Sequence, residues 1–219
     1  KMCYTFVRGI KMKISEPKIK NCEVSSFNEC VKNEEFNKVK IRENSSISLD
    51  LTDYTFDECV FENIDFSNIE ISDISLMDVK FISCDLSNKR FNDTFLTRVI
   101  FENCKLTGLT FMDSHLKDIK VTSSVGLYLN VASTNINNIE IEDSDLTEAT
   151  FNMSTLNNVV LNNVNLTKSI FLGCNLKDVD FSTSIINGIS FDIKSLNGII
   201  INKMDAGNIV SMFNVRVRN

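Results

Sequence analysis

The sequence predicts an all-β fold, a four-sided β-solenoid of about eight coils, and two periodicities indicate it. Every fifth residue from Leu51 to Ile201 is apolar at thirty of thirty-one positions, and Gly126 is the exception. A period of five fits neither a helix nor a strand, so the backbone must turn once in every five residues. When these positions are sorted by twenties, Phe collects in two columns and Leu in the other two. Four turns therefore make one coil, and like residues stack at about 4.8 Å.

A second apolar series lies two residues before each of these central positions and is expected to point inward as well. It contains smaller residues, among them Cys59, Ile64, Val79, Cys84 and Cys104. Cys84 and Cys104 are twenty residues apart and so occupy the same position on adjacent coils. A disulfide between them is an alternative, but two stacked thiols in a reducing compartment are the favoured interpretation.

The extent of the five-residue period divides the chain into three segments. Residues 49–204 form the solenoid, and residues 1–48 form an irregular lead whose weak repeats at Phe36 and Ile41 are expected to close the amino-terminal end. Residues 205–219 are expected to begin as a short helix capped by Asp205. This tail carries more apolar surface than the cap of a monomer needs. Its candidate interface residues are Ala206, Ile209, Val210, Met212, Phe213, Val215 and Val217.

Acidic residues are concentrated in the repeats. Between residues 50 and 205 there are 23 acidic and 11 basic residues, whereas residues 1–49 contain 6 acidic and 10 basic ones. The acidic residues form three ladders at multiples of twenty residues, and the fourth side holds a single acid, Glu148. The ladders consist of Asp53, Asp73, Asp93 and Asp113; of Glu58, Asp78, Asp118 and Asp178; and of Glu62, Glu102 and Glu142.

The stretch Asp145-Leu146-Thr147-Glu148-Ala149-Thr150-Phe151 resembles the A-(D/N)-L-x-x units of the pentapeptide-repeat proteins. The resemblance covers residues 49 to about 206 and implies a right-handed quadrilateral β-helix. Within that family the chain is similar to the Qnr and MfpA group, which bind DNA gyrase and protect it from quinolones. It resembles the members without loops, because the five-residue phase never shifts. The resemblance implies a two-fold homodimer through the tail, with DNA gyrase or topoisomerase IV as partner.

Several other classes of function find little support in the residues. The one histidine, His115, has no Ser, Cys or carboxylate near it in the repeat that would suggest a triad. The chain lacks a CxxC pair and a phosphate-binding Gly-rich loop. We therefore expect that the protein is not an enzyme and that it has no cofactor and no metal site. No run of eighteen apolar residues and no secretory signal is evident, which favours a cytoplasmic protein without a membrane partner. Because the rod is acidic, no nucleic-acid partner is expected either.

Two interpretations of the acidic ladders remain open at this stage. In the first interpretation the ladders need no functional explanation, because Asp and Asn suit tight turns and any rod must be soluble. The functional interpretation is that an anionic cylinder presents regularly spaced charges to a protein groove that is built for DNA. Together with the resemblance to the Qnr and MfpA group, this interpretation implies a DNA mimic that binds a type II topoisomerase and reduces fluoroquinolone susceptibility. The alternative is an acidic scaffold with an unrelated basic partner.

Overall fold

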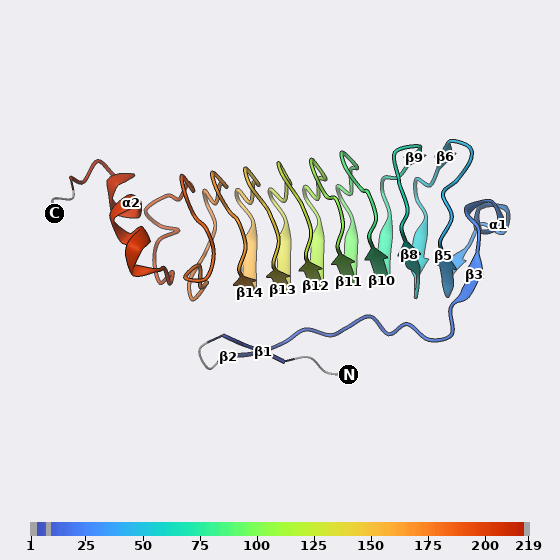
Figure 1. Ribbon diagram of the computed structural model, residues 1–219, viewed down its shortest axis with the longest axis horizontal. Coiled ribbons are helices and arrows are strands. Elements are labelled where there is room, and N and C mark those ends of the chain that lie inside the picture. Colours follow the sequence, from blue (N-terminus) through green and yellow to red (C-terminus); the bar gives the residue numbers. More distant parts are fainter. Residues whose placement is uncertain (1–3, 8–9, 217–219) are drawn as a thin grey trace.

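The chain winds into a four-sided parallel β-solenoid, with an extended amino-terminal segment along one side and a short helix at the far end (Figure 1). The computed structural model describes residues 4–7 and 10–216, with side chains from Ile14 onward. About seven complete coils lie between residues 49 and 188, and an incomplete coil follows them. The fold expected from the sequence is confirmed, with two additions at the amino-terminal end, an antiparallel hairpin and a helix.

The amino-terminal elements precede the regular coils. The hairpin comprises β1 (Tyr4–Val7) and β2 (Ile10–Lys13). The elements that follow are β3 (Glu23–Ser25), α1 (Phe27–Lys32), β4 (Phe36–Asn37), β5 (Val39–Ile41), β6 (Leu49–Asp50), β7 (Thr55–Asp57), β8 (Val60–Glu62) and β9 (Ile69–Glu70).

Five longer strands carry the middle of the rod, and each covers two adjacent sides of the solenoid. They are β10 (Ser75–Ile82), β11 (Phe95–Glu102), β12 (His115–Thr122), β13 (Asn135–Glu142) and β14 (Thr155–Asn162). The 3₁₀ turn η1 (Lys203–Asp205) and helix α2 (Ala206–Ser211) follow the last coil.

Neighbouring coils pair in one constant register. Phe36 pairs with Phe56, Leu76 with Leu96, and every later pair is likewise offset by twenty residues, as far as Asp180 with Ile200. The backbone turns at corners, and at most of them the residue two positions after the central residue has a positive φ, usually near +50° to +65°. This left-handed conformation is tolerated best by Gly, Asn and Asp. The offset leaves no room for an inserted loop, as the unbroken phase predicted.

The central residues form continuous columns in the interior. Phe61 and Phe81 stack at 5.2 Å between ring centroids, and Phe81 and Phe101 repeat that distance with rings only 4° from parallel. Phe151 and Phe171 stack at 4.6 Å in a second column. All of these side chains are at most 4% exposed. The sorting of Phe and Leu into separate columns therefore reflects direct stacking of like side chains.

Polar residues in the second inward series are satisfied by backbone carbonyls. The hydroxyl of Ser114 donates to the carbonyl of Phe91 at 2.9 Å, and the hydroxyl of Ser124 donates to that of Thr122 at 2.8 Å. The thiols of Cys84 and Cys104 take the same role, donating at 3.4 Å to the carbonyls of Phe61 and Phe81. Both cysteines are free, so the interpretation as stacked thiols is confirmed.

Helix α1 closes the amino-terminal end of the core. Its residues Phe27 and Cys30 are each 2% exposed, and the Phe27 ring lies 6.1 Å from those of Phe61 and Phe66. The hydroxyl of Ser26 accepts the backbone N–H of Glu29 at 3.2 Å and so caps the helix. The sequence offered this signal as Ser-x-x-Glu, the capping-box pattern, but the helix itself was not predicted.

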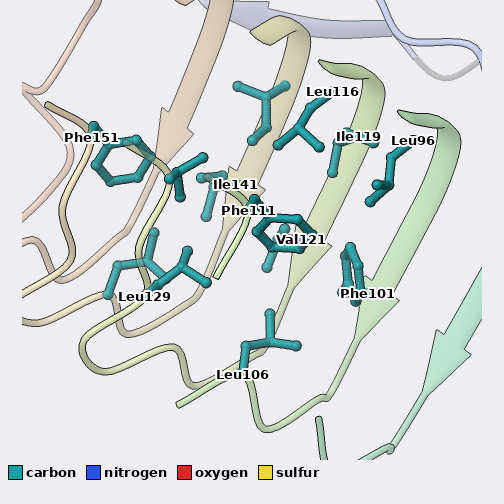
Figure 2. A pocket seen from close by; sticks show the side chains of 13 residues that line it. Leu96, Phe101, Leu106, Phe111, Leu116, Ile119, Val121, Leu129, Ile141 and Phe151 are labelled. Carbon is teal, nitrogen blue, oxygen red and sulfur yellow. The ribbon is translucent and has the colours of Figure 1, made fainter. Parts of the chain in front are cut away.

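The core holds a small apolar cavity near Gly126 (Figure 2). Gly126 stands where the two neighbouring coils have Leu, Val131 stands between Phe111 and Phe151, and Val121 stands between Phe101 and Ile141. Leu129, 7% exposed, fills part of the space. A methyl of Leu146 also leans in, 2.8 Å from where a Cβ on Gly126 would lie. The remaining cavity of about 30 Å³ costs about 0.7 kcal/mol by the usual scaling.

We predict that Phe101→Lys destabilises the solenoid strongly, whereas Phe95→Lys does not. Phe101 is 1% exposed within a stacked column and Phe95 is 61% exposed. Loss of the buried ring should remove about 3–5 kcal/mol, and the buried ammonium adds a desolvation cost. Thermal unfolding followed by circular dichroism measures both variants. A Phe101→Lys protein that melts within a few degrees of wild type would refute the interior assignment.

We also predict that Val121→Ile stabilises the protein by about 0.5–1 kcal/mol, since one added methylene fits the cavity beside Gly126. Val79→Ile is the matched control, because Val79 is 0% exposed and does not line the cavity. The control should be neutral or destabilising, as overpacked cores are. Urea unfolding gives both values, and equal effects of the two substitutions would contradict the prediction.

Candidate partner-binding surfaces

The first acidic ladder, called here the Asp93 ladder, consists of Asp53, Asp73, Asp93 and Asp113. All four residues are exposed and occupy corners, with φ between 51° and 65°. They lie on four consecutive coils, and so about 4.8 Å apart. Among the residues that the structure describes, no salt bridge involves any of these four carboxylates. The ladder is an unneutralised row of charge that faces solvent.

The same corner changes character toward the carboxyl-terminal end. Its next residues are Ser133, Met153, Gly173 and Ile193. Met153 is 71% exposed and Ile193 is 74% exposed. One edge of the rod is therefore acidic over its first four coils and largely apolar near the tail.

The second predicted ladder has a different environment. Three of its members, Glu58, Asp78 and Asp118, are called here the Asp78 row. Asp78 and Asp118 are each 5% exposed, because the segment of residues 14–22 runs across them outside the solenoid (Figure 1). The backbone N–H groups of Lys20 and Lys18 donate to Glu58 Oε2 at 3.2 Å and to Asp78 Oδ1 at 2.8 Å. Asp178, the fourth predicted member, is exposed at the other end of the rod.

Arg98 interrupts this ladder between Asp78 and Asp118. Its Nη2 donates to Asp78 Oδ2 at 2.7 Å, and its Nε pairs with the other carboxylate oxygen. Burial opposes ionisation of Asp78, but the hydrogen bonds from Arg98 and from the Lys18 amide prevail and hold the pKa of Asp78 below its ordinary value. Arg98 lies twenty residues after Asp78 and so belongs to this column, although only its acidic members were predicted from the sequence.

The third predicted ladder is sparse, because Glu62, Glu102 and Glu142 lie on alternate coils, about 10 Å apart, a distance at which exposed charges are largely screened. Glu62 pairs with Lys40 at 2.5 Å and with Arg42 at 2.8 Å. The hydrogen bond from Lys40 is the main reason that the pKa of Glu62 is lowered. Glu142 accepts the side-chain amide of Asn162 at 3.1 Å, and Glu102 is exposed.

The tail divides into a buried and an exposed part. Ile209 is 6% exposed and joins the core of the last coil, so α2 closes that end. Val210 and Met212 are each 40% exposed and Val215 is 51% exposed. Ala206 is exposed and Phe213 is half-buried, whereas Val217 lies outside the described residues. The side chain that caps this end is Asn202, which accepts the N–H of Met204 at 2.9 Å; Asp205 makes no side-chain cap.

His115 stacks on Phe95, with ring centroids 5.0 Å apart and planes within 6°. Within the described part of the chain, no three His, Cys, Asp or Glu residues are grouped so as to hold a metal ion. No helix of the described residues has the length and apolar character to cross a membrane.

The comparison with protein families agrees with this geometry. A family model for the pentapeptide repeat region matches residues 49–128, 74–151 and 94–171. A search of curated proteins finds no significant match. A trypsin-treated variant of QnrB1, a plasmid-mediated fluoroquinolone resistance protein, is 15% identical, with 84% of this chain and 98% of that chain covered and a TM-score of 0.37. HetL, a pentapeptide repeat protein involved in heterocyst differentiation regulation in the cyanobacterium Nostoc sp., is 13% identical, with 80% and 95% covered and a TM-score of 0.39.

The family matches together span residues 49–171, more than half of the chain, and they coincide with the coils in constant register. The chain belongs to the pentapeptide-repeat family.

Proposed function

We propose that this protein binds a type II topoisomerase, DNA gyrase or topoisomerase IV, at the surface that grips DNA, and thereby reduces fluoroquinolone susceptibility. It would act in the cytoplasm by binding alone, without catalysis. The proposal extends what the sequence resemblance to the Qnr and MfpA group implies. The observation that carries it is the Asp93 ladder, four exposed carboxylates on consecutive coils, none of which forms a salt bridge with any residue of the described chain.

Turn geometry does not account for charge at all four of these corners. Asn and Gly satisfy the left-handed conformation equally well, and other corners use Asn63, Asn103 and Gly108. Two carboxylates about 5 Å apart repel each other by about 1 kcal/mol in water, and by more near a low-dielectric wall. A column of four Asp is thus electrostatically unfavourable where Asn would serve, which supports a role for the charges in recognising a basic groove.

The Asp93 ladder is a better candidate for the partner-facing side than the other two ladders. The Asp78 row is covered by the chain's own amino-terminal segment, and Arg98 neutralises part of it. The third ladder carries charge only on alternate coils, and Glu62 is already paired. We therefore propose that Asp73, Asp93 and Asp113 lie at the centre of the partner interface.

We predict that the triple variant Asp73→Asn, Asp93→Asn, Asp113→Asn binds a type II topoisomerase about tenfold more weakly, mostly through a slower on-rate. The matched control is Asp65→Asn, Asp85→Asn, Asp145→Asn, which removes three charges from another side. Asn can keep the hydrogen bonds that these three Asp accept from Ser67, Ser87 and Thr147. The variants are compared by surface plasmon resonance at two salt concentrations, which gives the on-rate. Supercoiling assays with and without ciprofloxacin give the effect on the enzyme.

Wild-type binding should weaken as salt rises, because exposed charges are screened. Equal binding by both triple variants would remove the support for a DNA mimic. If neither wild type nor variant binds a topoisomerase at all, the result supports the acidic scaffold with an unrelated basic partner instead.

We further propose that the active form is a two-fold dimer through the tail. The exposed side chains of Val210, Met212 and Val215 would be covered in such a contact, and an isologous interface would join two rods end to end. The apolar corner residues Met153 and Ile193 lie on the carboxyl-terminal coils, at the end of the rod that would be joined.

The double variant Val210→Asp, Met212→Asp should therefore be a folded monomer, since both residues are exposed and Ile209 still closes the core. Val24→Asp is the control, because Val24 is 67% exposed at the opposite end of the rod. Sedimentation velocity at micromolar concentration should give a dimer for wild type and for the control. A monomeric wild type would count against the proposed dimer.

A further inference from the structure

The amino-terminal segment of residues 14–20, called here the strap, lies extended along the outside of the rod and across several coils (Figure 1). Its backbone donates three hydrogen bonds to carboxylates of the Asp78 row. Lys20 donates to Glu58 and Lys18 to Asp78, and the N–H of Ser15 donates to Asp118 Oδ1 at 3.3 Å. These contacts join residues 38, 60 and 103 positions apart in the chain.

The spacing of an extended chain is close to the spacing of the coils. From Ser15 to Lys18 the chain takes three residue steps, about 10 Å, and Asp78 and Asp118 lie two coils, about 9.6 Å, apart. From Lys18 to Lys20 it takes two steps, about 6.6 Å, and Glu58 and Asp78 lie one coil, about 4.8 Å, apart, a difference that the long Glu58 side chain can span. A segment of this length therefore places one amide opposite each carboxylate of the row.

The strap is held by its backbone and by charge more than by burial. Residues 11–20 contain four Lys and one Glu, and they run beside an acidic rod. The side chains of Lys18 and Lys20 remain exposed. Apolar anchoring comes from Ile14, 8% exposed, which packs on Val160 of β14. Segments with few buried apolar contacts open at low free-energy cost.

We propose that the Asp78 row is a docking track for an extended, lysine-bearing peptide segment, and that residues 14–20 are its resident occupant. Carboxylates on successive coils accept the amides of the bound segment, so recognition depends on an extended backbone and on the charge of the acceptors, because a carboxylate accepts a stronger hydrogen bond than a neutral amide oxygen does. A single lysine side chain of the segment contributes little, since those of Lys18 and Lys20 stay exposed. The strap can detach without unfolding the solenoid, because Asp78 keeps its pair with Arg98. A basic partner segment that uses this side of the rod must first displace the strap.

The consequence for topoisomerase binding rests on the proposed function, but the docking itself does not. If the topoisomerase uses this side as well as the Asp93 ladder, releasing the strap strengthens that binding. If the topoisomerase proposal fails, the strap still docks on the Asp78 row and can be measured without any partner protein.

The first experiment compares two full-length variants at the same position, Lys18→Pro and Lys18→Ala. Proline removes the N–H that Asp78 accepts, whereas alanine keeps this N–H and removes the side chain. Hydrogen exchange of residues 14–22, followed by mass spectrometry, should be at least about tenfold faster in the proline variant than in wild type. The alanine variant should stay close to wild type. Equal exchange in wild type and the proline variant, or equally fast exchange in both variants, would overturn the proposal.

The second experiment supplies the occupant in trans. A fluorescent peptide of residues 12–22 should bind the Lys18→Pro protein at least about tenfold more tightly than wild type, because only the variant has a vacant track. In the Lys18→Pro background, Asp78→Asn with Asp118→Asn should weaken this binding. Asp73→Asn with Asp113→Asn should not, although it removes two charges from the same coils.

Two results of the peptide measurement would refute the docking track. One is equal affinity for wild type and the Lys18→Pro protein, since the strap would then not compete with the peptide. The other is an equal loss from the two Asp-to-Asn pairs, since the attraction would then be general to the acidic rod. Dimerisation by exchange of straps between two copies would give a concentration-dependent mass that the Lys18→Pro variant lacks, and this result too would contradict an intramolecular occupant.

Discussion

The constant register of twenty residues between neighbouring coils is the constraint on which the rest of this structure depends. It requires a corner after every five residues, and most corners place one residue in the left-handed conformation, as at Asp93, Asn103 and Gly108. Once the register is fixed, each side chain lies directly over its equivalents in the coils before and after it. Phe61, Phe81 and Phe101 then form one column, and the hydroxyls and thiols behind them reach carbonyls at repeated positions. Any inserted residue would shift every column beyond it.

The same register converts a preference for turn residues into rows of charge on the surface. The three acidic rows differ in what surrounds them, although they look similar in the sequence. The Asp93 ladder faces solvent, the Asp78 row lies beneath the strap, and Glu62 is paired with Lys40 and Arg42. The second row shows that an acidic column in this fold can hold polypeptide through its amides. Charge alone therefore does not identify the partner-facing side, and the covering segments must be considered with it.

The repetitive part of the fold was predictable from the sequence because each inward position must carry an apolar or small side chain in coil after coil. The apolar series from Leu51 onward identified the interior, and the absence of loops followed from its phase. The lead was predicted less well. Helix α1 closes the end through Phe27 and was missed, although Ser26 and Glu29 carry a capping signal. The strap was not foreseen, since it binds through the backbone N–H groups of Ser15, Lys18 and Lys20, which every residue except proline possesses. A hydrogen bond from an amide leaves no trace in side-chain type, so no pattern in the sequence reports it.

The cavity near Gly126 lies beneath the length of rod that the strap crosses, so the strap also bears on how the coils are held together. In a solenoid each coil contacts only its neighbours, so cooperativity passes along the rod through one interface at a time and is weakest where that interface is poorest. Stacked Phe columns lie on both sides of the cavity, at Phe81–Phe101 and at Phe151–Phe171. The strap makes contacts on both sides of this weak interface, with Glu58 and Asp78 before it and with Val160 beyond it. While it is docked, the strap adds a direct link between the two halves of the rod, and when it detaches the solenoid stays folded but is held there by nearest-neighbour contacts alone.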